Sequence, residues 1–533
     1  MAQEGKRVQH SAPQSRRDTH HSDSRRDDYD RHDRYDREPP RNDPPRRKQK
    51  KKQTHTKLGV VFTVIELILW IVFGVTLLRL NMLPTVLTAV VLVVLLAIII
   101  GVGFMIGRAR GNARVVVGII LDVLVGALMV VGSAYMLRGM SALHNITNTK
   151  TEVAVMNVYV RTDDAAQSLS DAAGYTFGIM SELDRENTDK AVEQVNQELN
   201  TTISTQEFEG STELVDALLN HTVDAIVLNA AYVDLLTETE GYENVTSQIR
   251  VLAEKQTETV VEQPAENTDL ISSPAGVFTM YISGIDSRTG LIAKSRSDVN
   301  ILATVNTETK QVLLVSTPRD YYVPLSISNG VRDKLTHAGI YGVDVSVDTL
   351  EMLYGINIDY YFRVNFSGFE NIIDALGGVT VQSDYDFSAG GYTFVKGANT
   401  LNGSQALAFA RERHAFADGD HQRGRDQMAV IKGVINKLVS PSFLTNYSSV
   451  LTAIEGNFET TVPSDVIASL VRQQLSDGGD WNVVSYSVSG TGDSQKPYSM
   501  STKAYVMWPD ETTVATAQEL MRQVRDGEIL TQP

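Results

Sequence analysis

Three long apolar stretches near the beginning of the chain are the clearest feature of its hydrophobic pattern. They cover residues 58–78, 82–106 and 115–137. Each stretch is long enough to cross about 30 Å of hydrocarbon as an α-helix. The first two are joined by a very short connection, whereas residues 107–114 carry three arginines. We therefore predict three transmembrane helices within residues 58–140.

Two carboxylates, Glu66 and Asp122, interrupt these apolar stretches. A carboxylate inside a membrane often marks a path for protons or ions. With only two such residues in three helices, the pattern favours a structural role, in which each side chain packs against a neighbouring helix.

Short segments that alternate between strand-like and helix-like patterns follow the third apolar stretch. Strands are expected at residues 153–160, 203–208 and 223–228, and helices at residues 189–199 and 212–219. This alternation predicts a small α/β accessory domain over residues 150–253. Its acidic residues resemble a solvated face, and nothing in it indicates catalysis. The polar, proline-containing residues 254–275 are interpreted as a linker.

The pattern changes after residue 276, where apolar strands end in clusters of charged and polar residues. Strands are expected at residues 277–282, 299–305 and 311–316. A helical run covers residues 405–410, and a second helix ends near Leu438. Polar residues at the ends of buried strands are typical of a site, so residues 276–533 are the candidate functional domain.

Charge is strongly segregated along the chain. Residues 1–57 carry a net charge of +7, whereas residues 150–533 hold 26 Lys+Arg against 52 Asp+Glu. A basic head, an apolar middle and an acidic body describe a membrane-anchored protein and exclude a soluble cytoplasmic enzyme. The chain has no cysteine, which excludes disulfides, thiolate catalysis and cysteine–zinc sites. This absence is compatible with the outside of a Gram-positive cell.

The positive charges also predict the orientation of the chain in the membrane. Basic loops stay in the cytoplasm, so residues 1–57 and 107–114 are expected inside. Three crossings then place residues 138–533 outside the cell. The head has too few apolar residues to fold and is predicted to be disordered. Its basic cluster at residues 46–52 either binds anionic membrane lipids or only fixes the topology, and its interleaved acids argue against nucleic-acid binding.

Arginines at loops and element ends stand out in an otherwise acidic body. They are Arg296, Arg319, Arg411, Arg413, Arg423 and Arg425. If they converge, their guanidinium groups suit a polyanion such as a diphosphate. Asp286 and Asp298 lie at neighbouring strand ends, and such carboxylates hold Mg²⁺ together with substrate phosphates. Surface ion pairs are the alternative explanation, since no single spacing is diagnostic. Common serine-hydrolase, zinc-protease and Walker motifs are missing from the sequence.

Taken together, several motifs resemble the LytR-CpsA-Psr family. They are Gly284-Ile285-Asp286-Ser287-Arg288, Arg296-Ser297-Asp298, Ser316-Thr317-Pro318-Arg319-Asp320, and Arg411-Glu412-Arg413 followed by Arg423 and Gln427. The match covers roughly residues 275–440. The apolar helices, basic head and accessory domain are similar to the streptococcal, capsule-linked CpsA-type members. The resemblance implies an α/β catalytic domain over residues 276–533, α-β-α sandwich-like with a mixed sheet.

The resemblance also implies an activity: a Mg²⁺-dependent phosphotransferase, with Mn²⁺ as an alternative metal. Such an enzyme moves a capsular or other wall polysaccharide from a polyprenyl-pyrophosphate carrier onto the muramic acid 6-hydroxyl of peptidoglycan. By position, Asp286 and Asp298 would bind the metal. The pyrophosphate would be bound by Arg296, Arg319, Arg411, Arg413, Arg423 and Gln427. The catalytic group would comprise Arg319, Arg411, Arg413 and Asp420, with Asp420 as the candidate base.

Three other functions remain open from the sequence. A regulatory role as a transcriptional attenuator would require the basic head to bind DNA selectively. A lipid-diphosphate-binding scaffold would need the arginines for binding but would form no phosphodiester. A pyrophosphatase would use water in place of the sugar hydroxyl.

Overall fold

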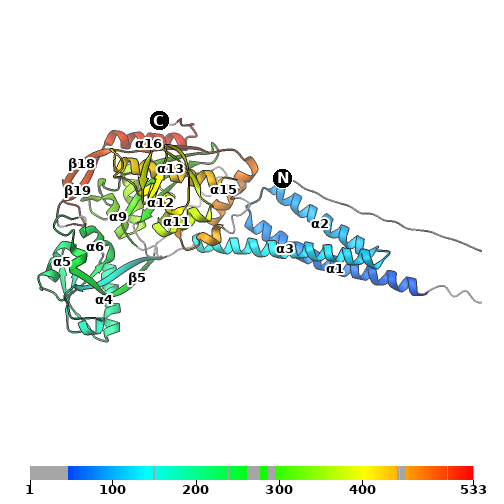
Figure 1. The fold of residues 1–533 in the computed structure, drawn as a ribbon, viewed down its shortest axis with the longest axis horizontal. Helices are drawn as coiled ribbons and strands as arrows, with labels where there is room; N and C mark the ends of the chain where they lie inside the picture. The colour runs from blue at the N-terminus through cyan, green and yellow to red at the C-terminus, as the bar shows by residue number, and fades with distance from the viewer. Residues whose placement is uncertain are drawn as a thin grey trace, which may run out of the picture. The chain divides into compact units, whose positions relative to one another are not determined.

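The computed structural model describes residues 46–147, 151–237, 239–260, 276–285, 294–440, 443, 450–500 and 502–531 (Figure 1). The described residues belong to two separate units, which divide between residues 54 and 55. In the first unit the described residues are 46–54, which begin helix α1. Every other described helix and strand belongs to the second unit.

Three long helices come first, namely α1 (Arg46–Leu80), α2 (Thr85–Gly107) and α3 (Asn112–Thr147). Their apolar parts, of 26, 23 and 33 residues, are long and apolar enough to cross a membrane, as predicted. Glu66 and Asp122 are each 3% exposed. A β-carbon at Gly126 of α3 would lie 2.5 Å from a Glu66 carboxylate oxygen, so the two helices approach closely there. This packing agrees with a structural role for Glu66.

The end of the basic head differs from the prediction. Its composition predicts disorder for residues 46–57 together with the rest of the head, but these residues form the first turns of α1. Lysine, arginine and glutamine are good helix formers, so the apolar helix extends backwards through them. Residues 1–45 lie outside the described residues.

A first sheet has the strand order β3-β2-β4-β1-β5. Its strands are β1 (Thr151–Arg161), β2 (Thr176–Met180), β3 (Ser204–Phe208), β4 (Ala225–Asn229) and β5 (Ile249–Val260). The accompanying helices are the 3₁₀-helix η1 (Leu169–Ala172), α4 (Arg185–Leu199), α5 (Ser211–Leu219), α6 (Ala230–Thr237) and α7 (Val245–Gln248). Strand β2 pairs in parallel with β3 and β4, whereas β1 is antiparallel to β4 and β5.

Strand β5 enters the range that the sequence pattern assigns to a linker. Residues 254–260 pair with β1, and residues 261–275 lie outside the described residues. The strand is at the sheet edge, where Glu254, Gln256 and Glu258 are exposed while Thr257 is buried. Only one face of this segment is covered, so most of its residues are polar and its composition resembles that of a linker. The alternation of buried and exposed side chains, with a period of two, is nevertheless that of a strand.

A second, mixed sheet has the strand order β16-β11-β6-β7-β8-β17. Its strands are β6 (Val277–Ile285), β7 (Ser297–Asn306), β8 (Gln311–Ser316), β11 (Tyr360–Asn365), β16 (Phe458–Thr460) and β17 (Asn482–Ser487). The pairs β11–β6 and β8–β17 are parallel, and the other three pairs are antiparallel.

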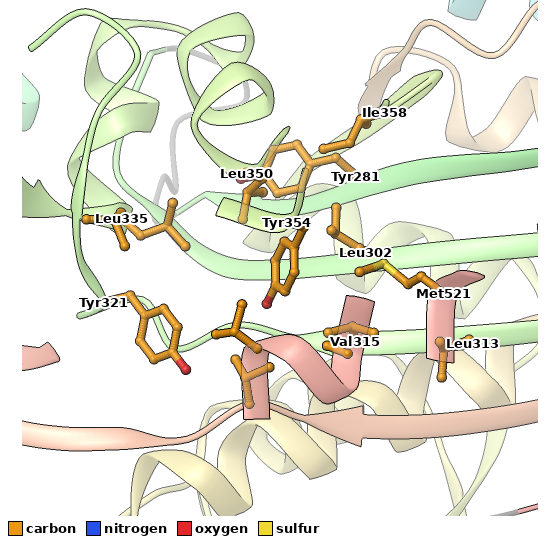
Figure 2. Packing of buried hydrophobic residues seen from close by; sticks show 14 of the residues in the cluster. Tyr281, Leu302, Leu313, Val315, Tyr321, Leu335, Leu350, Tyr354, Ile358 and Met521 are labelled. Carbon is orange, nitrogen blue, oxygen red and sulfur yellow. The ribbon is translucent and has the colours of Figure 1, made fainter. Parts of the chain in front are cut away.

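Helices cover both faces of this sheet, which gives an α-β-α arrangement. Leu302, Leu313 and Val315 pack against α10 (Val343–Tyr354) and α16 (Glu511–Arg525), and Figure 2 shows them beside Tyr354 and Met521. Their neighbours Ile301 and Leu314 face α13 (Asp420–Leu438) and α15 (Ser464–Asp477). Because alternate side chains are buried on both faces, these strands are almost continuously apolar.

Smaller elements complete the second unit. The helices are α9 (Leu335–Tyr341), α11 (Phe366–Ala375) and α12 (Gly403–Arg411). The strands are β9 (Tyr322–Pro324), β10 (Arg332–Lys334), β12 (Val379–Ser383), β13 (Phe387–Ala389), β14 (Tyr392–Phe394), β15 (Gly397–Leu401), β18 (Gly490–Gln495) and β19 (Ala504–Pro509).

Candidate functional site

A large apolar cavity lies beside the second sheet, with a volume of about 1050 Å³. Its walls come from β6, β7 and β8 on the sheet side and from α11, α13 and α15 on the helix side. Aliphatic and aromatic side chains dominate, for example Ile282, Ala303, Phe369, Ile431 and Leu470. A cavity of this size and character suits a long hydrocarbon chain better than a sugar.

Charged residues that were predicted as site residues line the same cavity. They are Arg296, Asp298, Arg319, Arg411, Arg413 and Arg423, and the predicted Gln427 lines it as well. Asp420 lines a small adjoining hollow, which it shares with Asp298, Arg319, Arg423 and Gln427. Asp286 lies outside the described residues. The structure therefore brings together every residue of the predicted metal, pyrophosphate and catalytic groups that it describes.

The centre of this group is the Asp298 carboxylate at the start of β7. Its Oδ1 accepts hydrogen bonds from Arg319 Nη1 at 2.9 Å and from Thr336 Oγ1 at 3.2 Å. Strand β7 is antiparallel to β8, so the residues that follow β8 return to the start of β7. Burial would raise the pKa of the Asp298 carboxyl, but Arg319, Arg296 and Arg423 outweigh it and hold this pKa below its ordinary value. Asp298 is therefore an anion at neutral pH.

The first turns of α13 supply Asp420, Arg423 and Gln427 from one side of the helix. Arg423 forms an ion pair with Asp420, one turn before it. A β-carbon at Gly424 would lie 2.8 Å from Ser316 Oγ, so the helix packs closely against the end of β8 and a larger residue there would require the Ser316 side chain to move. Burial lowers the pKa of the Arg423 guanidinium, and the positive charges of Arg319 and Arg413 lower it further against the opposing effect of Asp420 and Asp298.

Arg411 and Arg413 are exposed and follow one another at the end of α12. The Arg411 guanidinium lies over the Phe366 ring, 4.2 Å from its centroid. Glu412 Oε1 accepts the backbone N–H groups of Arg413, His414 and Ala415 at 3.0, 2.6 and 2.8 Å. Its carboxylate therefore fixes the loop that presents Arg413 to the cavity.

We call the five arginines Arg296, Arg319, Arg411, Arg413 and Arg423 the arginine site. Among the described residues, the carboxylates of Asp298, Asp420 and Glu412 line the same cavity or the adjoining hollow, and Asp320 Oδ2 lies 3.7 Å from Arg319 Nε. The surplus of positive charge favours an anion, and planar guanidinium groups match phosphate oxygens in pairs. A pyrophosphate diester, with one negative charge on each phosphorus group, fits both the charge and the apolar cavity beside it.

Arg425 does not belong to this group, although the sequence places it among the basic residues that could converge. Its Nη2 donates to Asp418 Oδ2 at 2.8 Å, and its Nε donates to Gln422 Oε1 at 2.8 Å. Arg425 follows Arg423 by two positions, so the helix turns the two side chains in different directions.

Three contributors were missed in the sequence, namely Thr336, Phe366 and Glu412. Thr336 and Phe366 come from elements far away in the chain, and no local sequence pattern predicts their contacts with the site. Glu412 lies inside the Arg411-Glu412-Arg413 motif. Its place between the two arginines is the only feature of the sequence that indicates a role in the site.

The described residues fit a magnesium ion only in part. Among them, no group of three or more His, Asp or Glu side chains is close enough to hold a metal. Asp298 supplies one ionised carboxylate beside the surplus arginines. Mg²⁺ is commonly held by one or two carboxylates and completes its shell with phosphate oxygens and water, so this donor set suits Mg²⁺ that arrives with a phosphate-bearing substrate.

Comparison with known proteins agrees with the motifs. The LytR_cpsA_psr family model matches residues 239–522, which is more than half of the chain. The chain belongs to this family. The match begins within the region assigned to the accessory domain, before the expected start of the catalytic domain at residue 276.

Several similar proteins are named polyisoprenyl-teichoic acid–peptidoglycan teichoic acid transferase TagU. The Bacillus licheniformis protein is 40% identical over 189 residues, which are 35% of this chain and 61% of the relative. The Enterococcus faecalis protein is 34% identical over 249 residues, which are 46% of this chain and 80% of the relative. Among solved structures, B. subtilis TagV is 26% identical with a TM-score of 0.40, over 48% of this chain and 98% of its own.

Proposed function

We propose that this protein transfers a wall glycopolymer from a polyprenyl-pyrophosphate carrier to peptidoglycan. The observation that carries the proposal is the arginine site beside an apolar cavity of about 1050 Å³. A lipid-linked pyrophosphate is the substrate that needs both surfaces at once. The names of the relatives support wall-polymer transfer to peptidoglycan, and a capsular polysaccharide or a teichoic acid would suit the same site.

The chemistry follows from where charge develops. A hydroxyl oxygen of the acceptor, proposed to be the muramic acid 6-hydroxyl, attacks the phosphorus that carries the glycopolymer. A new P–O bond forms, the P–O bond to the lipid phosphate breaks, and the lipid phosphate leaves with the electron pair. Arg319, Arg411 and Arg413 meet the negative charge that gathers on this leaving group. Fixed donors aimed at developing charge lower the barrier because they need not reorganise.

Asp420 is the proposed base that takes the proton of the attacking hydroxyl. Its side chain is 26% exposed, so an acceptor can reach it, and it lies in the hollow next to Asp298 and Arg423. The ion pair with Arg423 holds its carboxylate in place. The other arginines, Arg296 and Arg423, together with Gln427, bind the pyrophosphate in the ground state.

Asp298 and Asp286 are proposed to hold Mg²⁺, or Mn²⁺ in its place. The metal would neutralise phosphate charge and polarise the phosphoryl oxygens. The lowered pKa of Asp298 keeps this ligand ionised at the pH of the cell surface.

The membrane topology also belongs to the proposal. The chain is anchored by α1, α2 and α3 with its N-terminus in the cytoplasm and the arginine site outside, where the flipped carrier displays its sugar. Arg108, Arg110 and Arg114 at the α2–α3 turn support this orientation. The α1–α2 turn supports it as well, because Asn81 is hydrogen-bonded to Arg472 of α15 and so lies on the side of the outer body.

The test is transfer of a lipid-linked saccharide to peptidoglycan fragments by the purified full chain in detergent with Mg²⁺. The expected product is a phosphodiester that survives removal of the lipid. Asp298→Ala should abolish metal-dependent transfer, whereas Asp418→Ala, at an exposed carboxylate that pairs with Arg425, should not. Release of the saccharide phosphate into water would instead indicate a pyrophosphatase, and binding without any product would indicate a scaffold.

A further inference from the structure

The turn between α1 and α2 packs against α15, a helix beside the second sheet. Leu77, Leu80 and Met82 of this turn form an apolar cluster with Ala468 of α15 and with Met136 and Leu143 of α3. We call residues 77–83 the anchor turn. Leu80 and Met82 are only 7% and 3% exposed, so the contact removes them from solvent.

A polar contact fastens the same turn. Arg472 Nη1, on α15, donates to the side-chain oxygen of Asn81 at 2.5 Å and to its backbone oxygen at 3.3 Å. Asn81 has a φ of 51°, a left-handed conformation that asparagine tolerates better than most residues. The turn is thus held by a side chain whose own helix lines the cavity.

The anchor turn and the cavity share residues. Met82 lines the cavity, and so do Leu451, Ile467 and Val471, which pack against the apolar cluster that contains the anchor turn. At these residues the apolar wall of the cavity therefore continues into the helices that are long enough to cross a membrane, beside the polar contact between Asn81 and Arg472.

We propose that the anchor turn is the bilayer-side wall of the lipid-tail site, and that the polyprenyl tail runs along Met82 as it passes from the membrane to the cavity. This rests on the function proposed above. Moving a hydrocarbon tail through water is unfavourable in proportion to the number of CH₂ groups that become exposed. A continuous apolar path avoids this cost, so the anchor takes part in binding the substrate as well as in tethering the enzyme.

Photo-crosslinking on the unmodified full chain in lipid vesicles tests this path. The probe is a polyprenyl pyrophosphate with a diazirine near the far end of its tail, and the control is a polyprenol with the same diazirine and no pyrophosphate. We expect crosslinks to the anchor turn and to α15 from the pyrophosphate probe in several-fold excess over the control. Equal crosslinking by both probes would mean contact with bulk lipid only, and would overturn the proposal.

The pattern of crosslinks separates this proposal from the proposed function. Crosslinks to cavity residues such as Phe369 with none at the anchor turn would overturn the role of the turn and leave the function standing. No crosslink at either place would count against both. The chain has no cysteine, so its crosslinked peptides are mapped without disulfide exchange.

A variant gives a second, kinetic test. Met82→Gln keeps the length of the side chain but places an amide in the path. The KM for a full-length polyprenyl donor should rise about four- to fifteen-fold, as expected for the loss of one or two buried CH₂ contacts, while the KM for a farnesyl donor stays unchanged. Val86→Gln, on α2 at 75% exposure and outside the cavity lining, is the matched control. Equal effects on both donors would show a structural defect and contradict the proposal.

Discussion

The arginine site differs sharply from a second group of buried charges in the same unit. Arg363 of β11, Glu459 of β16, Glu152 of β1 and Lys294 form this group, which we call the Glu152–Arg363 cluster. Arg363 Nε donates to Glu459 Oε2 at 2.9 Å, and its Nη1 pairs with Glu152. Glu152 Oε2 lies 3.7 Å from Lys294 Nζ, and its Oε1 accepts the backbone N–H of Val343 at 3.2 Å.

The two groups teach what distinguishes a structural cluster from a binding site. In the Glu152–Arg363 cluster two cations meet two anions, and Arg363 is 1% exposed. In the arginine site cations outnumber carboxylates among the described residues. Burial lowers the pKa of both Arg363 and Arg423. The carboxylates of Glu152 and Glu459 more than offset this effect, so the pKa of Arg363 is raised. The pKa of Arg423 stays below its ordinary value. Net positive charge beside a cavity, rather than buried charge alone, therefore distinguishes the candidate anion site from the structural cluster.

The cluster also gives the first sheet a role. Glu152 belongs to β1, whereas Arg363 and Glu459 belong to the second sheet, and Lys294 lies two residues before Arg296. The backbone N–H of Lys294 donates to the carbonyl of Val153 at 2.7 Å. The first sheet thus holds the segment that enters the arginine site.

Arg363→Met should produce the largest effect, because it leaves Glu152 and Glu459 buried without their common partner. Removal of one member of a buried ion pair typically costs about 3–5 kcal/mol in the free energy of unfolding. Urea unfolding of the full chain in detergent, followed by fluorescence, measures this loss. Arg185→Met is the control, since Arg185 is 39% exposed and its pairs with Asp189 and Glu207 lie at the surface. Its loss should not exceed about 1 kcal/mol, and equal losses would remove the distinction.

Arg411→Ala and Arg413→Ala should have the opposite profile, with lost transfer and little change in the free energy of unfolding. Each removes one donor to the leaving phosphate, which typically costs about 10²–10³ in rate. Both side chains are exposed, so the free energy of unfolding should fall by no more than about 1 kcal/mol, the value of the contact between Arg411 and the Phe366 ring. Arg425→Ala, which removes an arginine paired with Asp418, should retain normal transfer. Near-normal transfer by both site variants would mean that these arginines are surface groups.

The sequence predicts much of this contrast, but for unequal reasons. The arginine site is predictable because its residues lie at or next to the ends of strands and helices, positions that a pattern of apolar runs makes visible. Asp298, Arg319 and Arg423 needed only the right order of strands to converge. The Glu152–Arg363 cluster was not predicted. Its members lie within or beside strands, and a single charged residue there does not interrupt the apolar pattern of the strand.

Misjudged boundaries have a similar cause. Residues 254–260 have the composition of a linker and become a strand only because β1 offers them a pairing edge. Residues 46–57 have the composition of a disordered tail and become helical because they continue an apolar helix. In both cases a neighbouring element decides the structure, and local composition does not record it.

Asp426→Asn examines a carboxyl group that is buried without a cation of its own. Asp426 is 2% exposed and accepts from Gln422 Nε2 at 2.9 Å. Burial raises its pKa to about 7, and the nearby Asp384 adds to this, while Gln422 and Arg425 oppose it. The folded state therefore binds more protons than the unfolded state between about pH 4 and pH 7, and stability falls as pH rises through this window.

Replacing this carboxyl by an amide should remove that part of the pH dependence. At pH 8 the free energy of unfolding of the Asp426→Asn variant should exceed that of the wild type by roughly 1–3 kcal/mol, because a buried group without a full set of partners typically costs this much. The difference should vanish near pH 4, where the wild-type carboxyl group is protonated. Urea unfolding at several pH values measures both. Asp418→Asn, at a carboxylate that is 60% exposed, should leave the profile unchanged. A difference that is constant with pH would assign the effect to packing instead.

Phe366→Leu should give the smallest effect of these variants, a modest loss of affinity for pyrophosphate at the arginine site. The Phe366 ring lies under the Arg411 guanidinium, and a cation–π contact at an exposed site is worth about 0.5–1 kcal/mol. The affinity for inorganic pyrophosphate, measured by calorimetry with Mg²⁺, should therefore fall about two- to five-fold. Phe369→Leu, one turn further along α11 in the cavity wall, should leave this affinity unchanged because no cation lies over its ring among the described residues.

The decisive measurement is the double variant: once Arg411 is replaced by alanine, Phe366→Leu should have no further effect, since the ring then has no cation to hold. If the two losses simply add, Phe366 acts through the cavity wall and Arg411 is positioned by other contacts.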